Sequence, residues 1–234
     1  MEYPIEADTR SRVFVTGGTG YIGQHLIPQL LRDNFQVTAV VRKGSEMKVP
    51  AGCLGLIADV LDGSTYADRV TPEHTFVHLA GVSHPSPAKA RQFVEIDRRS
   101  AMEAIRVARE RNAMHFVYVS VAHPAPVMKA YIAVREECER EILRSGLNST
   151  ILRPWYVLGP GHYWPYLLKP LYWLAERIPA TSAGARRLGL VTIGEMVGAL
   201  VHAVEYPAEG VEIVEPPGIG NSTAPRAPGA AEAE

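Results

Sequence analysis

Cysteine is scarce in this chain of 234 residues. The two cysteines, Cys53 and Cys138, lie far apart, so the sequence shows neither a disulfide framework nor cysteine spacing typical of a metal site. The formal net charge is only -1, which argues against nucleic acid as a partner, because proteins that bind it usually carry a basic face. We therefore expect a protein of the reducing cytoplasm that binds a small molecule.

Long apolar runs are also missing. The first residues, 1–6, are acidic and lack the apolar core of a signal peptide. No run reaches the roughly 20 apolar residues that span a bilayer. The nearest candidate, 163–178, is interrupted by prolines and charges. This pattern favours a buried amphipathic helix, with contact at a membrane surface as the less favoured alternative.

What the chain does contain is an alternation of strand and helix patterns. Expected strands lie at 12–16, 36–42, 53–58, 75–80, 115–121, 149–152 and 211–214. Expected helices lie at 21–33, 88–111, 128–144, 166–177 and 193–205. Such alternation predicts an α/β fold of the Rossmann type, a doubly wound parallel sheet with helices on both faces.

The same pattern predicts one domain at 12–215. We expect an N-terminal extension at 1–11, a small substrate lobe at about 155–215, and a flexible tail at 216–234, where proline, glycine and alanine leave little to bury.

A glycine-rich turn lies between the first expected strand and the first expected helix. Its core reads Thr-Gly-Gly-Thr-Gly-Tyr-Ile-Gly at 16–23. Gly17 suits a tight turn, Gly20 leaves room for a phosphate, and Gly23 lets the helix pack close to the strand. Backbone N–H groups at the helix start would then face an anion. This context predicts a site for the pyrophosphate of a dinucleotide.

Further motifs follow in order along the chain. Asp59-Val60 comes after the third strand, His78-Leu79-Ala80-Gly81 after the fourth, and Ser120 ends the fifth. A helix with Tyr131 follows, and then the segment Leu152-Arg153-Pro154-Trp155-Tyr156-Val157-Leu158-Gly159-Pro160-Gly161. In this order the motifs resemble the short-chain dehydrogenase/reductase superfamily in its extended or atypical branch. The two groups most similar are the epimerase/dehydratase-like proteins and the NmrA-like NAD(P)H-binding proteins.

The resemblance assigns a set of cofactor contacts. It implies that Asp59 and Val60 flank the adenine, although Asp59 could instead cap its loop. It implies that Leu79, Ala80 and Gly81 line the ribose and nicotinamide side. The remaining implied contacts are Thr19, Tyr21 and Ile22 in the glycine turn, Tyr131 and Arg135 on the helix, and Pro154, Tyr156 and Val157 after the sixth strand.

The end of the second strand favours NADP(H) over NAD(H). An acidic side chain there would bind the ribose 2′-hydroxyl, but Arg42 and Lys43 stand at this position, and Asp33 comes too early. Arg42 could pair with a 2′-phosphate through a charge-assisted contact. The less favoured alternative is that both charges are solvated strand-end groups.

The resemblance also implies a catalytic Tyr131 that exchanges a proton with the substrate oxygen, with Ser120 orienting the substrate. The residue four positions after Tyr131 is Arg135, where the family has lysine. The two share a helix face. Arginine provides charge but is effectively never deprotonated, so it cannot join a proton relay. His78, His84 and His123 show no metal-binding spacing.

Three interpretations remain open. Ser120, Tyr131 and Arg135 form a working triad for hydride transfer at a carbonyl or alcohol carbon. Alternatively, the chain binds the cofactor without turnover, as a redox sensor or scaffold. In the third, Tyr131 is a packing residue and Arg135 forms a surface pair with Glu139 among other solvated charges of this helix.

Aromatic residues crowd the segment after the sixth strand. They are Trp155, Tyr156, His162, Tyr163, Trp164 and Tyr166. Such walls suit an apolar or ring-shaped small substrate. A buried core, or a surface between two copies of the chain in a homodimer, fits them equally well.

Overall fold

The computed structural model describes residues 11–125, 127–160 and 189–221. Seven parallel strands form one sheet in the order β3-β2-β1-β4-β5-β6-β9. The strands are β1 Arg12–Thr16, β2 Gln36–Val41, β3 Leu54–Ile57, β4 His74–His78, β5 His115–Val119, β6 Ser149–Leu152 and β9 Val211–Val214. A separate pair joins β7 Tyr156–Leu158 to β8 Leu190–Thr192.

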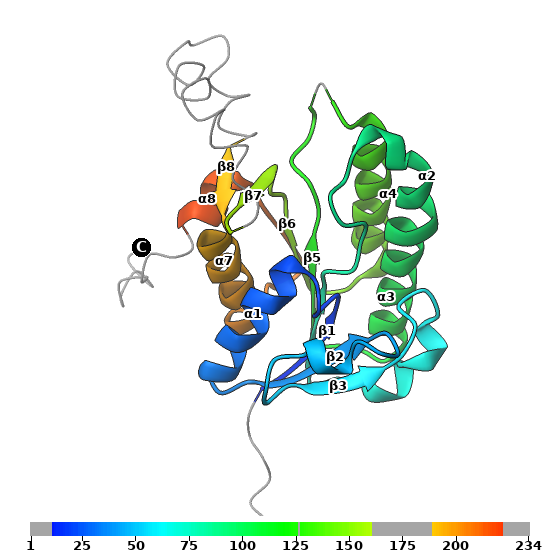
Figure 1. Cartoon of the computed structure of the whole chain (residues 1–234), viewed down its shortest axis with the longest axis vertical. Coiled ribbons are helices and arrows are strands. Elements are labelled where there is room, and N and C mark those ends of the chain that lie inside the picture. The colour runs from blue at the N-terminus through cyan, green and yellow to red at the C-terminus, as the bar shows by residue number, and fades with distance from the viewer. Residues whose placement is uncertain (1–10, 126, 161–188, 222–234) are drawn as a thin grey trace, which may run out of the picture.

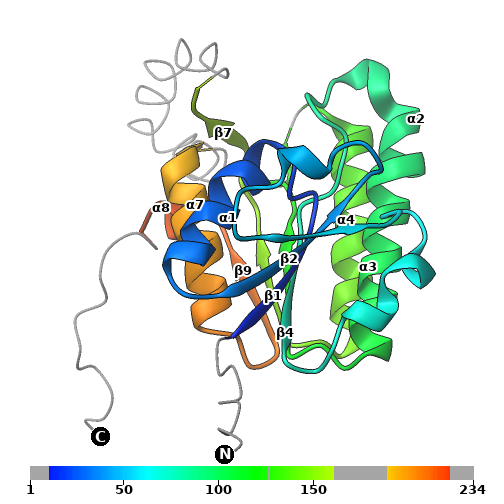
Figure 2. The ribbon, with the colours of Figure 1, turned by 60° about the horizontal axis from the view of Figure 1, so that its bottom comes forward.

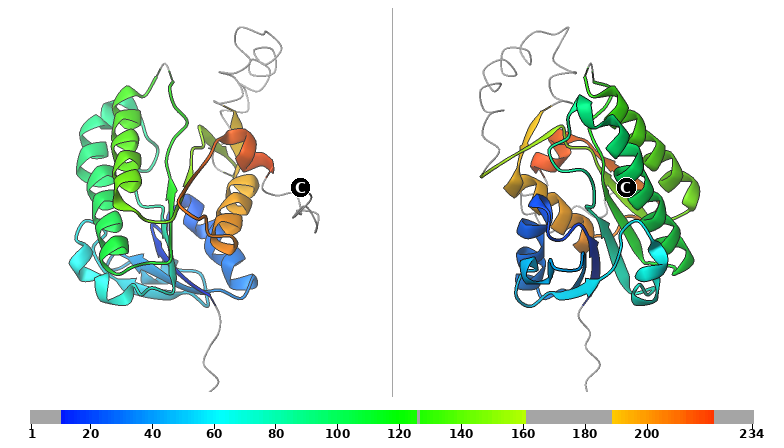
Figure 3. Two further views of the ribbon diagram at one scale, coloured as in Figure 1. Left: turned by 180° about the vertical axis from the view of Figure 1, so that it is seen from behind. Right: turned by 45° about the vertical axis from the view of Figure 1, so that its right-hand side comes forward.

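Helices cover both faces of the sheet (Figure 1). The α-helices are α1 Tyr21–Arg32, α2 Ala90–Gln92, α3 Arg99–Glu110, α4 Lys129–Ser145, α7 Ile193–Glu205 and α8 Pro216–Asn221. Short 3₁₀ turns lie at η1 Glu46–Lys48, η2 Gly63–Thr65, η3 Ala67–Arg69 and η4 Pro87–Lys89, and the π-helix η5 spans Phe93–Arg98. Helices α1 and α7 pack together on one face, and α3 and α4 on the other (Figure 2). Figure 3 shows the same layers from behind and from the side.

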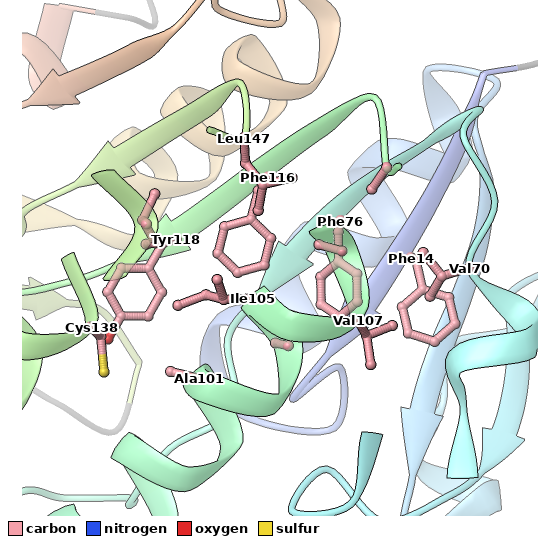
Figure 4. Close-up of a cluster of buried hydrophobic side chains, with 14 of the residues drawn as sticks. Phe14, Val70, Phe76, Ala101, Ile105, Val107, Phe116, Tyr118, Cys138 and Leu147 are labelled. Atoms are coloured by element: carbon pink, nitrogen blue, oxygen red, sulfur yellow. The ribbon is translucent and has the colours of Figure 1, made fainter. Parts of the chain in front are cut away.

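Each face of the sheet carries its own apolar core. Beneath α3 and α4, the rings of Phe14, Phe76 and Phe116 contact one another at tilted angles and are fully buried (Figure 4). They come from β1, β4 and β5, which are neighbours in the sheet. The core beneath α1 and α7 is aliphatic and includes Leu26 and Leu200. Burial on both faces explains why the central strands, such as β1 and β5, read as continuous apolar runs rather than alternating ones.

The predicted architecture is confirmed, with local corrections. The helix expected at 88–111 is divided, because the π-turn η5 interrupts it. The segment that follows the sixth strand, where no strand was expected, contains β7. The expected tail begins with the helix α8, because Ile219 is fully buried in the core beneath α7. The helix expected at 166–177, most of the N-terminal extension and the rest of the tail lie outside the described residues.

No helix among the described residues is long and apolar enough to span a bilayer. The parallel arrangement instead brings the carboxyl ends of all seven strands to one edge of the sheet. In open α/β sheets this edge is where ligands bind, at the point where the strand order reverses. Here the reversal lies between β1 and β4, and the glycine turn follows β1 directly.

Candidate cofactor and active site

The glycine turn lies against the loop that follows β4. Gly17 has a φ of +77°, and a Cβ added to it would lie 2.6 Å from the backbone nitrogen of Ala80. The backbone N–H of Leu79 donates to the carbonyl oxygen of Thr16 at 2.9 Å, which ties the two loops together. Gly23 packs against Gly18 just as tightly. Only glycine fits at positions 17 and 23, because a Cβ at either would collide with neighbouring backbone atoms.

The start of α1 is left open for an anion. Its N-cap residue is Gly20, which offers no side-chain cap, and its first turn holds no acidic residue. The first N–H groups of a helix lack intrahelical partners, and they carry a partial positive charge. Thr19, Tyr21 and Ile22 surround this end and are all half-buried. A pyrophosphate therefore fits here, on residues that the glycine pattern of the sequence predicts.

Two cations lie exposed where β2 ends. Arg42 and Lys43 form no ion pair with any of the residues that the structure describes. The Glu46 carboxylate accepts from the backbone N–H of Gly44 at 3.0 Å and so closes the turn behind them. Asp33 caps the far end of α1, away from the carboxyl edge of the sheet. Arg42 is thus available for a phosphate.

Asp59 and Val60 follow β3 at the same edge. One carboxylate oxygen of Asp59, Oδ1, accepts from the backbone N–H of Leu61 at 2.9 Å. This hydrogen bond is the loop cap that the sequence offered as the alternative to an adenine contact. Thr65 also bonds the Asp59 backbone, so the loop is well braced. An exposed carboxylate on a braced loop is compatible with both roles.

Tyr131 and Arg135 lie on one face of α4, as their spacing predicts. The guanidinium carbon Cζ of Arg135 lies 4.9 Å from the centre of the Tyr131 ring, in cation–π geometry. Phe93 of η5 contacts the same ring, with centroids 4.9 Å apart. Tyr131 is half-buried between them.

Arg135 is buried, and its charge is paired with that of Asp97. Its Nη2 donates to Asp97 Oδ1 at 2.6 Å, and its Nη1 donates to the carbonyl oxygen of Val119 and to the hydroxyl of Tyr118. Burial raises the pKa of Asp97, and the guanidinium opposes this rise. The interpretation that Arg135 forms a surface pair with Glu139 is therefore wrong, because Asp97 binds this cation inside the protein.

Ser120 is buried as well, and its hydroxyl donates to Glu139 Oε1 at 2.5 Å. Glu139 also accepts from Arg153 at 2.5 Å, and His123 lies 3.3 Å away. Burial raises the pKa of Glu139, but the hydrogen bonds from Arg153 and Ser120 outweigh it and hold the pKa below its usual value. Glu139 was expected on a solvated helix face, and this is wrong: the residue is 4% exposed.

The segment after β6 completes the carboxyl edge. The carbonyl oxygen of Pro154 accepts from the backbone N–H of Ala122 at 3.0 Å, which joins it to the loop after β5. Tyr156 and Val157 lie in β7 and are half-buried, and burial raises the pKa of Tyr156. Trp155 meets the Tyr156 ring edge-on. The aromatic residues His162, Tyr163, Trp164 and Tyr166 lie outside the described residues.

Comparison with known proteins agrees with this geometry. The profile of a family described as NAD(P)H-binding matches residues 17–160. The chain belongs to this NAD(P)H-binding family. This match confirms the NAD(P)H-binding family that the sequence motifs indicate.

The curated relatives include two reductases. The ceramide reductase of Caulobacter vibrioides is 26% identical over 88% of this chain and 65% of its own. The 3-diazoavenalumate denitrifying reductase of a Streptomyces species is 27% identical over 85% of this chain and 74% of its own. The present chain thus spans less than two thirds of the first relative.

Solved structures confirm the fold. WbmH of Bordetella bronchiseptica, in complex with NAD+, matches with a TM-score of 0.67 and 19% identity over 88% of this chain and 76% of that one. The UDP-glucose 4-epimerase of Thermus thermophilus, in complex with NAD, matches with a TM-score of 0.62 and 21% identity over 87% and 77%.

Two of the predicted site residues, Arg135 and Ser120, donate hydrogen bonds to buried acids. Sequence reasoning missed Asp97 and Glu139, although both gave a signal. Asp97 comes four residues after the buried Phe93, and Glu139 four after Arg135, so each acid falls on a buried helix face. A charged residue on such a face needs a partner, which here is an arginine.

The histidine that ends β4 has a packing role. His78 Nδ1 lies 2.8 Å from the hydroxyl of Thr16, and the ring stacks on Tyr118. Among the described residues, no cluster of histidine, cysteine and acidic side chains could hold a metal ion.

Proposed function

We propose that this protein is an NADP(H)-dependent reductase that acts at a carbonyl or alcohol carbon of a small substrate. The observation that carries the proposal is the placement of Tyr131 over Arg135, on a helix beside the loop that lies against the glycine turn. The names of the two relatives support a reductase over an epimerase. The aromatic side chains of Trp155 and Tyr156 support a substrate with an apolar part.

Tyr131 is the proton donor for reduction in this proposal. NADP(H) would be held by the glycine turn and Arg42 and would supply the hydride for the carbonyl carbon. The phenol then gives its proton to the substrate oxygen and completes the alcohol. The guanidinium carbon of Arg135 lies 4.9 Å from the centre of the Tyr131 ring, so a fixed positive charge faces the residue that gives up the proton. Arg135 keeps its own proton, so the phenol regains its proton from water.

In this proposal Ser120 can accept a hydrogen bond from the substrate but does not donate one. Its hydroxyl hydrogen is directed at Glu139, so it offers a substrate an oxygen lone pair rather than a hydrogen. A hydrogen bond to this lone pair needs a donor on the substrate. Ser120 would therefore orient an alcohol hydroxyl rather than a carbonyl oxygen.

The test follows NADPH oxidation in the presence of a panel of small ketones and aldehydes, both aliphatic and aromatic. We expect turnover with wild type and a loss of at least 100-fold in Tyr131→Phe, the range of general acid catalysis. Binding of NADPH, followed by its fluorescence, should persist in the variant. Equal and negligible rates with intact binding would overturn the reductase.

That outcome would favour a second candidate, a cofactor-binding sensor or scaffold without turnover. Its specific support is that Arg135 and Ser120 both direct hydrogen bonds to buried acids. Such bonds stabilise the fold and leave fewer groups for a substrate.

Arg42 decides the cofactor preference in this proposal. We expect Arg42→Ala to weaken NADPH binding about tenfold, the loss of about 1.4 kcal/mol in a charge-assisted contact, and to leave NADH binding unchanged. Arg109→Ala is the control, because Arg109 is an exposed cation on α3. Tighter binding of NADH than NADPH by wild type would contradict the preference.

A further inference from the structure

Asp97 is an acid with no exposure at all, and it lies in an unusual element. The π-helix η5 contains it, and π-turns inside helices are rare and often occur at functional sites. Burying a carboxylate in an apolar core is unfavourable unless it is paired and hydrogen-bonded. The burial of Asp97 therefore needs an explanation beyond packing.

The two carboxylate oxygens of Asp97 contact two different parts of the fold. Oδ2 accepts from the backbone N–H of Val82 at 3.0 Å, in the loop that follows β4. Oδ1 accepts from Arg135 Nη2 on α4. Through Arg135 Nη1, which donates to the carbonyl oxygen of Val119, the same pair reaches the end of β5. One buried ion pair thus joins a loop, a strand end and two helices.

The loop after β4 lies between this ion pair and the glycine turn. A Cβ added to Gly81 would lie 2.8 Å from Asp97 Oδ1 and 3.0 Å from Arg135 Nη2, so its backbone rests directly on the pair. At the other end of the segment, a Cβ added to Gly17 would lie 2.6 Å from the carbonyl carbon of Leu79. Residues 79–82 are therefore held from two sides.

We propose that Asp97 is a positioning residue for the cofactor, acting with Arg135 to fix residues 79–82 against the glycine turn. This inference rests on the proposed binding of NADP(H). In this role Arg135 acts on the cofactor through the loop rather than by contact, because its guanidinium is already bound by Asp97, Tyr118 and Val119.

The test compares variants that separate the position of the loop from the stability of the fold. Removal of one charge alone would leave the other buried without a partner, whereas removal of both is often tolerated. We therefore pair Asp97→Leu with Arg135→Met in one variant, and use Asp97→Asn, which keeps the shape and one acceptor oxygen of the side chain, as a second. Arg98→Gln is the control, because Arg98 neighbours Asp97 and forms a half-exposed pair with Glu137.

Two quantities are measured on each variant. NADPH affinity is titrated by fluorescence, and hydrogen exchange of the backbone amides at 79–82 is followed without cofactor. We expect the double variant to melt near the wild-type temperature but to bind NADPH about tenfold more weakly, as for the loss of one buried hydrogen bond. In Asp97→Asn the Val82 amide should exchange faster while amides in β5 do not change. Arg98→Gln should match wild type in both.

Wild-type affinity and wild-type amide protection in the double variant would overturn the proposal, because the pair would then serve stability alone. If the double variant does not fold, unchanged Val82 protection and unchanged affinity in Asp97→Asn would overturn it in the same way. Failure of wild type to bind NADPH or NADH would overturn the proposed function instead. The amide exchange would still report whether Asp97 fixes the loop.

Discussion

At the scale of single residues, Gly17 is the one described glycine that combines a positive φ with an approach closer than 3.0 Å. Its φ of +77° and the 2.6 Å approach to the Ala80 nitrogen both exclude a side chain. We expect Gly17→Ala to lower the free energy of unfolding by about 2 kcal/mol and to weaken NADPH binding at least tenfold. Urea unfolding and fluorescence titration measure the two effects.

Gly146 provides the matched control for that variant. Its φ of +74° imposes the same backbone strain, but nothing lies within 4 Å of a Cβ added there. Gly146→Ala should therefore cost about 1 kcal/mol and leave NADPH affinity unchanged. Equal effects of the two variants on affinity would show that the close approach at Gly17 does not shape the cofactor site.

Glu139 is the residue on which the ends of β5 and β6 converge, through Ser120 and Arg153. Glu139→Gln would leave Arg153 with a weaker partner in a buried setting. We expect a loss of about 3 kcal/mol in the free energy of unfolding by urea. Glu137→Gln, which breaks a half-exposed pair with Arg98 on the same helix, should cost under about 1 kcal/mol. Similar losses in both would mean that burial adds nothing to the Glu139 pair.

At the scale of elements, α7 begins with a complete capping box. The Thr192 hydroxyl accepts from the backbone N–H of Glu195, and the Glu195 carboxylate accepts from that of Thr192. We expect Thr192→Ala to lower the free energy of unfolding by about 1 kcal/mol and Thr192→Ser to restore most of it. Urea unfolding at neutral pH is the measurement. No difference between the two variants would exclude a role for the cap.

The elements also show what the sequence could and could not predict. The central parallel strands could be predicted from the sequence because burial on both faces makes them continuous apolar runs, as in β2. Helix α7 was readable because its apolar positions recur with helical spacing. The strands β7 and β8 were not, because each has three residues and depends on a partner distant in the chain.

The same distinction between local pattern and long-range contact applies to the candidate site. Local pattern placed the glycine turn, and helical spacing placed Tyr131 beside Arg135. Helical spacing could place Asp97 and Glu139 on buried faces, but the arginines that pair with them lie 38 and 14 residues away in the chain, and no local pattern identifies those partners. For the same reason, spacing alone could not tell that Arg135 faces inward.

At the scale of the whole molecule, buried neutral histidines should set the response to acid. Burial lowers the pKa of His78 to about 3 and that of His115 to about 4. Their unfolded pKa is about 6.5, so below that pH the unfolded chain takes up protons that the folded chain excludes. Stability is therefore complete above about pH 6.5 and is lost progressively as the pH falls toward 4. Between pH 7.5 and pH 5.5 the two histidines together should remove about 2.5 kcal/mol.

Urea unfolding at these two pH values measures that loss, and substitution assigns it to its source. His115→Gln should lower stability at neutral pH, because it disturbs a buried side chain, and should also reduce the difference between pH 7.5 and pH 5.5. His25→Gln is the control, because His25 is exposed on α1 and should leave the difference unchanged. Equal stability of the wild-type protein at the two pH values would mean that the folded state accepts these protons. The two histidines would then not remain neutral in the folded interior.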